Sequence, residues 1–97
     1  MQIVVDLAEI PDDCGKIVDV RQGLRIALFR VENRVAAIND RCPHAMASLG
    51  EGDFDGTIIV CPVHQYRFNV WTGIGYGQVK TYPVEVIGEQ AHVTVPD

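Results

Sequence analysis

The chain has 97 residues, of which 47% are hydrophobic and 22% charged, and this composition indicates one small globular domain rather than a disordered chain. The formal net charge is −5, so nucleic-acid binding is not expected, because phosphate contacts need a concentrated positive patch. No apolar run approaches the roughly 20 residues that span a bilayer, and the start lacks the features of a signal peptide, so we expect a cytoplasmic protein without a membrane anchor. The acidic excess suits either steering toward a positively charged protein partner or solubility alone.

The chain is expected to form short β-strands, because no segment keeps a helical apolar period over two turns. Alternating or β-branched runs predict strands at Gln2–Asp6, Lys16–Val20, Leu24–Val31, Arg34–Asn39, Thr57–Val60, Val79–Ile87 and Ala91–Val95. Turns are predicted at Pro11–Gly15, at Glu32-Asn33, where asparagine tolerates a positive φ, and at Gly88-Glu89. Pro83 predicts an edge or a bulge within its strand.

Three segments lack strand patterns and are predicted to be loops: Arg41–Asp55, Pro62–Gln65 and Asn69–Gly77. The first contains Ala45–Leu49, where one helical turn is expected. In the third, Trp71 and Tyr76 form either a docking platform or internal packing. The predicted fold class is therefore all-β, a small antiparallel sandwich or barrel with loops at one end.

Two short motifs, Cys42-Pro43-His44 and Cys61-Pro62-Val63-His64, each place a thiol and an imidazole on one loop, and sixteen residues separate them. Two thiolates and two imidazoles can hold tetrahedral zinc or an asymmetric [2Fe–2S] cluster. In Cys-x-His the two side chains cannot easily bind one metal from a regular strand or helix face, so a turn that aims them at two irons fits better. One iron would then take Cys42 and Cys61, and the other His44 and His64. The third cysteine, Cys14, has no matching partner and is expected to be a bystander thiol.

These residues make the chain resemble Rieske-type [2Fe–2S] ferredoxins, in which Cys-x-His is followed by Cys-x-x-His after a gap of this size. The flanks Cys61-Pro62, Phe68-Asn69 and Thr72-Gly73 are also similar, and Tyr82–Val86 resembles the closing strands of ferredoxins from bacterial multicomponent oxygenases. The resemblance covers almost the whole chain and implies one Rieske domain over residues 1–97, with a cluster-binding subdomain formed by loops at about 41–55 and 61–77. It implies one [2Fe–2S] cluster per chain, bound by Cys42, His44, Cys61 and His64.

The resemblance further implies a soluble, monomeric one-electron carrier in aromatic hydrocarbon catabolism. It would accept electrons from an NAD(P)H-dependent flavoprotein reductase and pass them to a terminal oxygenase, either a ring dioxygenase or a diiron monooxygenase. Catalysis by the chain itself is not expected, because only His92 remains for a 2-His-1-carboxylate site. Two alternatives remain open: a small subunit of an assimilatory nitrite reductase, and a zinc-stabilised interaction module.

Several positions differ from the wider family. Respiratory Rieske proteins have a disulfide between the ligand loops, whereas the matching positions here are Ala47 and Val63. They also have a serine and a tyrosine that donate to sulfur, whereas Tyr66 and Phe68 stand here. Fewer donors stabilise the reduced cluster less, so we predict a reduction potential of roughly −150 mV, at the low end of the Rieske range. Gln65 stands where many Rieske proteins have glycine.

Overall fold

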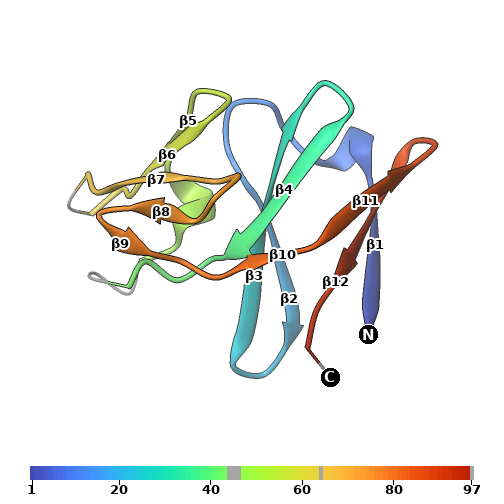
Figure 1. The fold of residues 1–97 in the computed structure, drawn as a ribbon, viewed down its shortest axis with the longest axis horizontal. Coiled ribbons are helices and arrows are strands. Elements are labelled where there is room, and N and C mark those ends of the chain that lie inside the picture. Colours follow the sequence, from blue (N-terminus) through green and yellow to red (C-terminus); the bar gives the residue numbers. More distant parts are fainter. Residues whose placement is uncertain (44–46, 64, 97) are drawn as a thin grey trace.

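A computed structural model describes residues 1–43, 47–63 and 65–96, and within them the chain is almost entirely antiparallel β-structure (Figure 1). The strands are β1 (Gln2–Asp6), β2 (Lys16–Arg21), β3 (Leu24–Val31), β4 (Arg34–Asn39), β5 (Asp53–Phe54), β6 (Ile58–Val60), β7 (Arg67–Asn69), β8 (Ile74–Gly75), β9 (Gly77–Gln78), β10 (Thr81–Tyr82), β11 (Val84–Ile87) and β12 (Gln90–Thr94). Two single 3₁₀ turns, η1 (Leu7–Glu9) and η2 (Leu49–Glu51), complete the described elements. The predicted all-β fold class is confirmed. No helix in the described part of the chain is long and apolar enough to cross a membrane.

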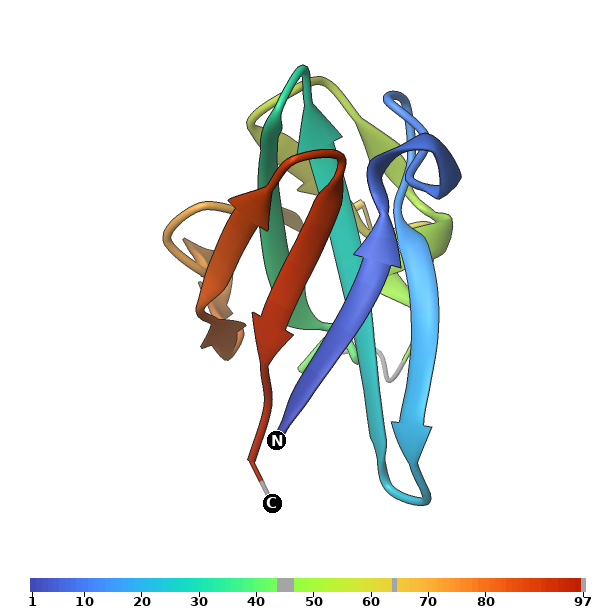
Figure 2. The ribbon, with the colours of Figure 1, turned by 90° about the vertical axis from the view of Figure 1, so that its right-hand side faces the viewer.

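The strands form three sheets, with the orders β1-β12-β11, β10-β4-β3-β2 and β5-β6-β7-β8-β9. Figure 2 views the first sheet, with β1 and β12 side by side in front of the central one. The third sheet lies on the left of Figure 1, on the opposite side of the central sheet. The molecule is therefore layered, and the central sheet is covered on both faces.

The central strands are apolar on both faces because each face packs against a different sheet. Ile26 and Leu28 of β3 belong to the apolar cluster shared with β1 and β12. Ala27 and Phe29 of the same strand belong to a second cluster, which includes residues of the third sheet. Successive side chains of a strand point to opposite faces, so this one strand contributes to both cores. The hairpin of β3 and β4 has the predicted bounds, and its left-handed residue is Glu32 (φ 55°) rather than Asn33.

The predicted strand Val79–Ile87 is wrong as a single element, because the chain changes sheets at Pro83. β10 pairs with β4 in the central sheet, whereas β11 pairs with β12 in the first sheet. Proline has no N–H for a ladder hydrogen bond, so a strand is readily interrupted there. Pro83 therefore marks a corner between two layers.

Four strands were not indicated by the pattern: β5 and β8 lie within predicted loops, whereas β7 and β9 overlap only the two ends of the predicted loop Asn69–Gly77. Each has two or three residues, too few to show a period. The expected helical turn at Ala45–Leu49 falls partly on residues 44–46, which lie outside the described residues, and the 3₁₀ turn η2 begins at Leu49.

Candidate metal centre

The first ligand loop follows β4, and a backbone hydrogen bond closes it. Cys42 N–H donates to the Ala47 carbonyl over 2.9 Å. Arg41 and Ser48 form an isolated antiparallel bridge immediately outside this bond. The bridge and the hydrogen bond hold the outgoing segment of the loop, residues 40–42, against its returning segment, residues 47–50. These two segments form the neck of the loop.

The second ligand loop follows β6 and is closed in the same way. Cys61 N–H donates to the Tyr66 carbonyl over 2.7 Å, again to the fifth residue after the cysteine. Gln65 N–H donates back to the Cys61 carbonyl over 2.9 Å. Gln65 has φ 57°, in the left-handed region that favours glycine. Each cysteine is therefore the first residue of a tight loop with the same backbone closure.

Both cysteines are fully buried, with exposed fractions of 0%, and belong to one apolar cluster. This cluster also contains Leu49, Ile59 and Phe68, which come from η2, β6 and β7. The structure thus brings together, in one apolar cluster, two soft sulfur donors that are nineteen positions apart in the sequence. Thiolate sulfur is the donor that zinc and iron–sulfur clusters prefer, and an apolar shell keeps water from such a cluster.

The other two predicted ligands, His44 and His64, lie outside the described residues. Within residues 1–43, 47–63 and 65–96, no three His, Cys, Asp or Glu side chains form a metal-binding group. Cys14 lies in the turn before β2, is not a member of the apolar cluster that contains Cys42 and Cys61, and is half-buried. Burial and the neighbouring Asp13 carboxylate raise the pKa of its thiol, which keeps it protonated at neutral pH. This environment agrees with the expected bystander role.

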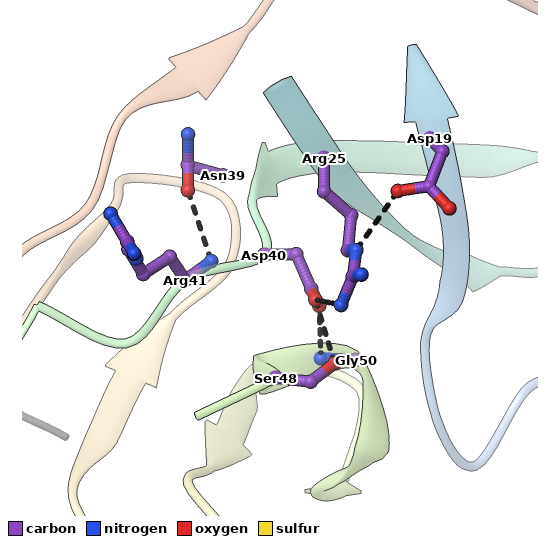
Figure 3. A network of polar contacts seen from close by, with 7 residues as sticks. All are labelled: Asp19, Arg25, Asn39, Asp40, Arg41, Ser48 and Gly50. Carbon is purple, nitrogen blue, oxygen red and sulfur yellow. Dashed lines mark hydrogen bonds and ion pairs between the residues drawn. The ribbon is translucent and has the colours of Figure 1, made fainter. Parts of the chain in front are cut away.

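Asp40 is the buried charged residue at the neck of the first loop (Figure 3), with an exposed fraction of 2%. Its carboxylate accepts hydrogen bonds from Ser48 Oγ (2.6 Å) and Gly50 N–H (2.7 Å). Burial raises the pKa of this carboxyl, and these two hydrogen bonds and the Arg25 guanidinium oppose the increase. Sequence reasoning missed this network. The one feature of the sequence that could have indicated it is a charged residue that directly follows an apolar strand and stands two residues before a predicted ligand.

Aromatic side chains flank the second loop. Tyr66 stacks on Tyr76, which lies in the turn between β8 and β9, with ring centroids 4.2 Å apart and planes 4° apart. Tyr76 is nevertheless 58% exposed. Trp71 instead packs against the apolar cluster, donates to the Gly56 carbonyl over 3.0 Å and lies 4.4 Å from the Arg34 guanidinium. The packing interpretation thus fits Trp71, whereas Tyr76 is both packed and accessible.

The curated relatives include ferredoxin components of dioxygenase systems. The chain is 36% identical over 95 residues to the ferredoxin component of the naphthalene 1,2-dioxygenase system of Pseudomonas aeruginosa, covering 92% of this chain and 89% of that protein. It is 38% identical over 86 residues to the ferredoxin component of the naphthalene 1,2-dioxygenase/salicylate 5-hydroxylase systems of a Ralstonia species, covering 82% and 81%. The prediction of an electron carrier rather than an enzyme is thereby confirmed.

Solved structures show the same architecture. The ferredoxin of carbazole 1,9a-dioxygenase from Nocardioides aromaticivorans IC177 superposes with a TM-score of 0.86 at 31% identity, covering 96% of both chains. A ferredoxin determined in complex with a carbazole 1,9a-dioxygenase oxygenase gives 0.84 at 28% identity, covering 97% of this chain and 100% of that one. A nitrite reductase small subunit from Mycobacterium tuberculosis gives 0.81 at 21% identity, covering 100% and 99%, which shows a shared fold only.

The predicted cofactor is confirmed at the level of the family. The buried pair of thiols fits the cysteine half of the donor set that such a cluster requires. The family model for the Rieske [2Fe–2S] domain matches residues 1–91. The chain therefore belongs to the Rieske [2Fe–2S] domain family.

Proposed function

We propose that this chain carries single electrons from an NAD(P)H-dependent flavoprotein reductase to a terminal oxygenase, through a [2Fe–2S] cluster held by Cys42, His44, Cys61 and His64. When bound, such a cluster accepts and releases one electron without a change in its ligands. The observation that carries the proposal is the pair of buried thiols, each beginning a loop with the same backbone closure. A histidine follows the cysteine by two residues in one loop and by three in the other.

The chain's own residues have three tasks in this function. The two thiols bind from the buried side, where the apolar cluster excludes water. The histidines are neutral ligands, and a less negative cluster accepts an electron more readily. The two loops follow β4 and β6, and a partner has to approach them closely for an electron to transfer. Electron-transfer contacts are typically small and transient, which suits this limited surface.

The ligand set is tested by EPR spectroscopy of the dithionite-reduced protein. We expect a rhombic signal with the low average g value of mixed His/Cys ligation. Cys42→Ser and Cys61→Ser should each abolish it, and the matched control Cys14→Ser should retain it, because Cys14 is a thiol outside the site. A colourless, EPR-silent sample that contains zinc would refute the proposed function, and loss of the signal in Cys14→Ser would refute the ligand set.

The oxygenase as partner is supported by the structural relative that was determined in complex with an oxygenase. Stopped-flow kinetics tests both exchanges: reduction by an NADH-reduced flavoprotein reductase, and reoxidation by an oxidised dioxygenase component. We expect reduction and reoxidation each to be faster than one turnover of the oxygenase. Since the chain has a net charge of −5, the reoxidation rate should fall with increasing ionic strength if the partner surface is positive. A rate that rises with salt would contradict that steering.

The same proposal treats residues 1–97 as one Rieske domain that acts as a monomer in the cytoplasm, with cluster loops at about 41–55 and 61–77. A half-buried thiol outside any disulfide, Cys14, suits a reducing compartment. Size-exclusion chromatography with light scattering tests the monomer. The resemblance to nitrite reductase subunits rests on fold alone, and the zinc-stabilised module is not supported, since the family is one of iron–sulfur domains.

A further inference from the structure

Asp40 joins the end of β4 to two other segments through all four of its polar groups. Its backbone N–H donates to the Arg25 carbonyl of β3 (3.0 Å), and its own carbonyl accepts from Leu49 N–H (2.6 Å). The two carboxylate oxygens accept from Gly50 N–H and Ser48 Oγ, as Figure 3 shows. Asp40 therefore connects the two sides of the first loop's neck to each other and to the central sheet.

The segment of residues 48–50, which donates three of these hydrogen bonds, has no room to move toward the sheet. A Cβ at Gly50 would lie 2.6 Å from Ile17 Cγ1 and 3.0 Å from Asp40 Oδ1. The Gly50 carbonyl also accepts from Gly15 N–H over 3.0 Å. The returning segment of the loop is thus packed against β2. Asp40 bonds the outgoing segment to this packed segment.

The charge of Asp40 is only weakly compensated. The Arg25 guanidinium approaches Asp40 Oδ2 at 3.8 Å, but its closer partner is Asp19, at 3.0 Å, and the Arg25 side chain is 54% exposed. Asp40 precedes Cys42 by two residues, so their Cα atoms lie within about 7 Å of each other. A negative charge in a buried environment acts more strongly than one in water.

We propose that Asp40 is a positioning residue for the cluster: its carboxylate holds the neck of the first ligand loop closed, and its buried negative charge lowers the reduction potential. The inference rests on the proposed ligation by Cys42. A negative charge near the site opposes the addition of an electron. Opening of the neck would release Cys42 from its buried position and expose the cluster to water and chelators.

The test compares three variants at one neutral pH. Asp40→Asn keeps an oxygen for Gly50 N–H and offers an amide to Ser48 Oγ, so it removes charge with little change in shape. Asp40→Ala removes both the charge and the hydrogen bonds. Glu85→Gln is the matched control, because it removes an exposed carboxylate on β11, outside the loop and outside the Asp40 network. The readouts are the potential from redox titration, the EPR g values, and the rate of cluster loss to an iron chelator.

We expect Asp40→Asn to retain the wild-type g values and to shift the potential upward, and Asp40→Ala to lose its cluster several-fold faster. Glu85→Gln should change neither. An unshifted potential in Asp40→Asn would overturn the charge effect, and wild-type cluster retention in Asp40→Ala would overturn the positioning role. If Asp40→Ala does not fold, Ser48→Ala replaces it, since it removes one hydrogen bond of the neck and keeps the charge. A wild-type protein without an EPR signal would instead refute the proposed function itself.

Discussion

Gln65→Gly is expected to stabilise the second ligand loop, because Gln65 adopts a backbone conformation that glycine adopts without strain. Its φ is 57°, and its side chain is exposed. A left-handed conformation costs an L-residue about 1–2 kcal/mol. Glycine removes that cost but gains about 0.4–1 kcal/mol of conformational entropy in the unfolded chain. The expected net gain is about 0.5–1 kcal/mol, or a rise of about 2–8 °C in the melting temperature of a domain of this size.

The chain offers a matched control outside the site. Glu32 has φ 55°, is also exposed and lies in the turn between β3 and β4. Glu32→Gly should therefore give a similar gain. Gln65→Ala removes the side chain but keeps the strained φ, so it should leave the melting temperature nearly unchanged.

The assay is thermal unfolding followed by circular dichroism at one fixed heating rate, with the cluster content verified before each scan. Gln65→Gly should also retain the wild-type reduction potential, since the backbone path of the loop is preserved. A melting temperature that falls in Gln65→Gly while it rises in Glu32→Gly would refute the reasoning. That result would mean that the Gln65 side chain stabilises the loop by more than its backbone strain costs.

Three further predictions concern other positions. Gly52→Ala should destabilise the protein by about 2 kcal/mol in urea titrations, because its Cβ would lie 1.9 Å from the Val60 carbonyl oxygen. Gly23→Asn has open space around it and should cost less than this, because only its φ of 85° disfavours a side chain there and asparagine adopts that region more readily than most residues. Backbone N–H groups of Ile58 and Thr57 lower the pKa of Asp55 below its unfolded value of about 3.9. The ionised Asp55 therefore stabilises the fold above that pH, and this contribution is lost as the pH falls through the folded pKa. Asp55→Asn should accordingly flatten the decline of the unfolding free energy below about pH 4. His64→Cys should lower the reduction potential if the cluster is retained, since a thiolate replaces a neutral ligand, and an unchanged potential would contradict ligation by His64.

The central hairpin and the ligand motifs could be predicted from the sequence because their signals are local. The β3–β4 hairpin is an uninterrupted pair of apolar runs with a polar turn, and its bounds agree with the prediction. The four predicted ligands stand at a spacing that few other sites share, so the family was indicated before any fold was known.

The strands of the third sheet and the corner at Pro83 were decided by tertiary structure. Strands of two or three residues, such as β5 and β8, have no period of their own and exist because a neighbouring strand supplies their hydrogen bonds. Pro83 predicted an interruption, but not that β10 and β11 would join different sheets. That choice depends on which strand edges are free once the other layers are packed.

The predicted donor chemistry thus depends on the sequence alone, which places two cysteines and two histidines in two short motifs. Only the folded chain decided how the cysteines are held: both buried in one apolar cluster, in loops closed by equivalent backbone bonds. Asp40 shows the difference most clearly. A single aspartate before a cysteine has no pattern of its own, and its role arises from β3 and η2, which are distant in sequence and contact it only after folding.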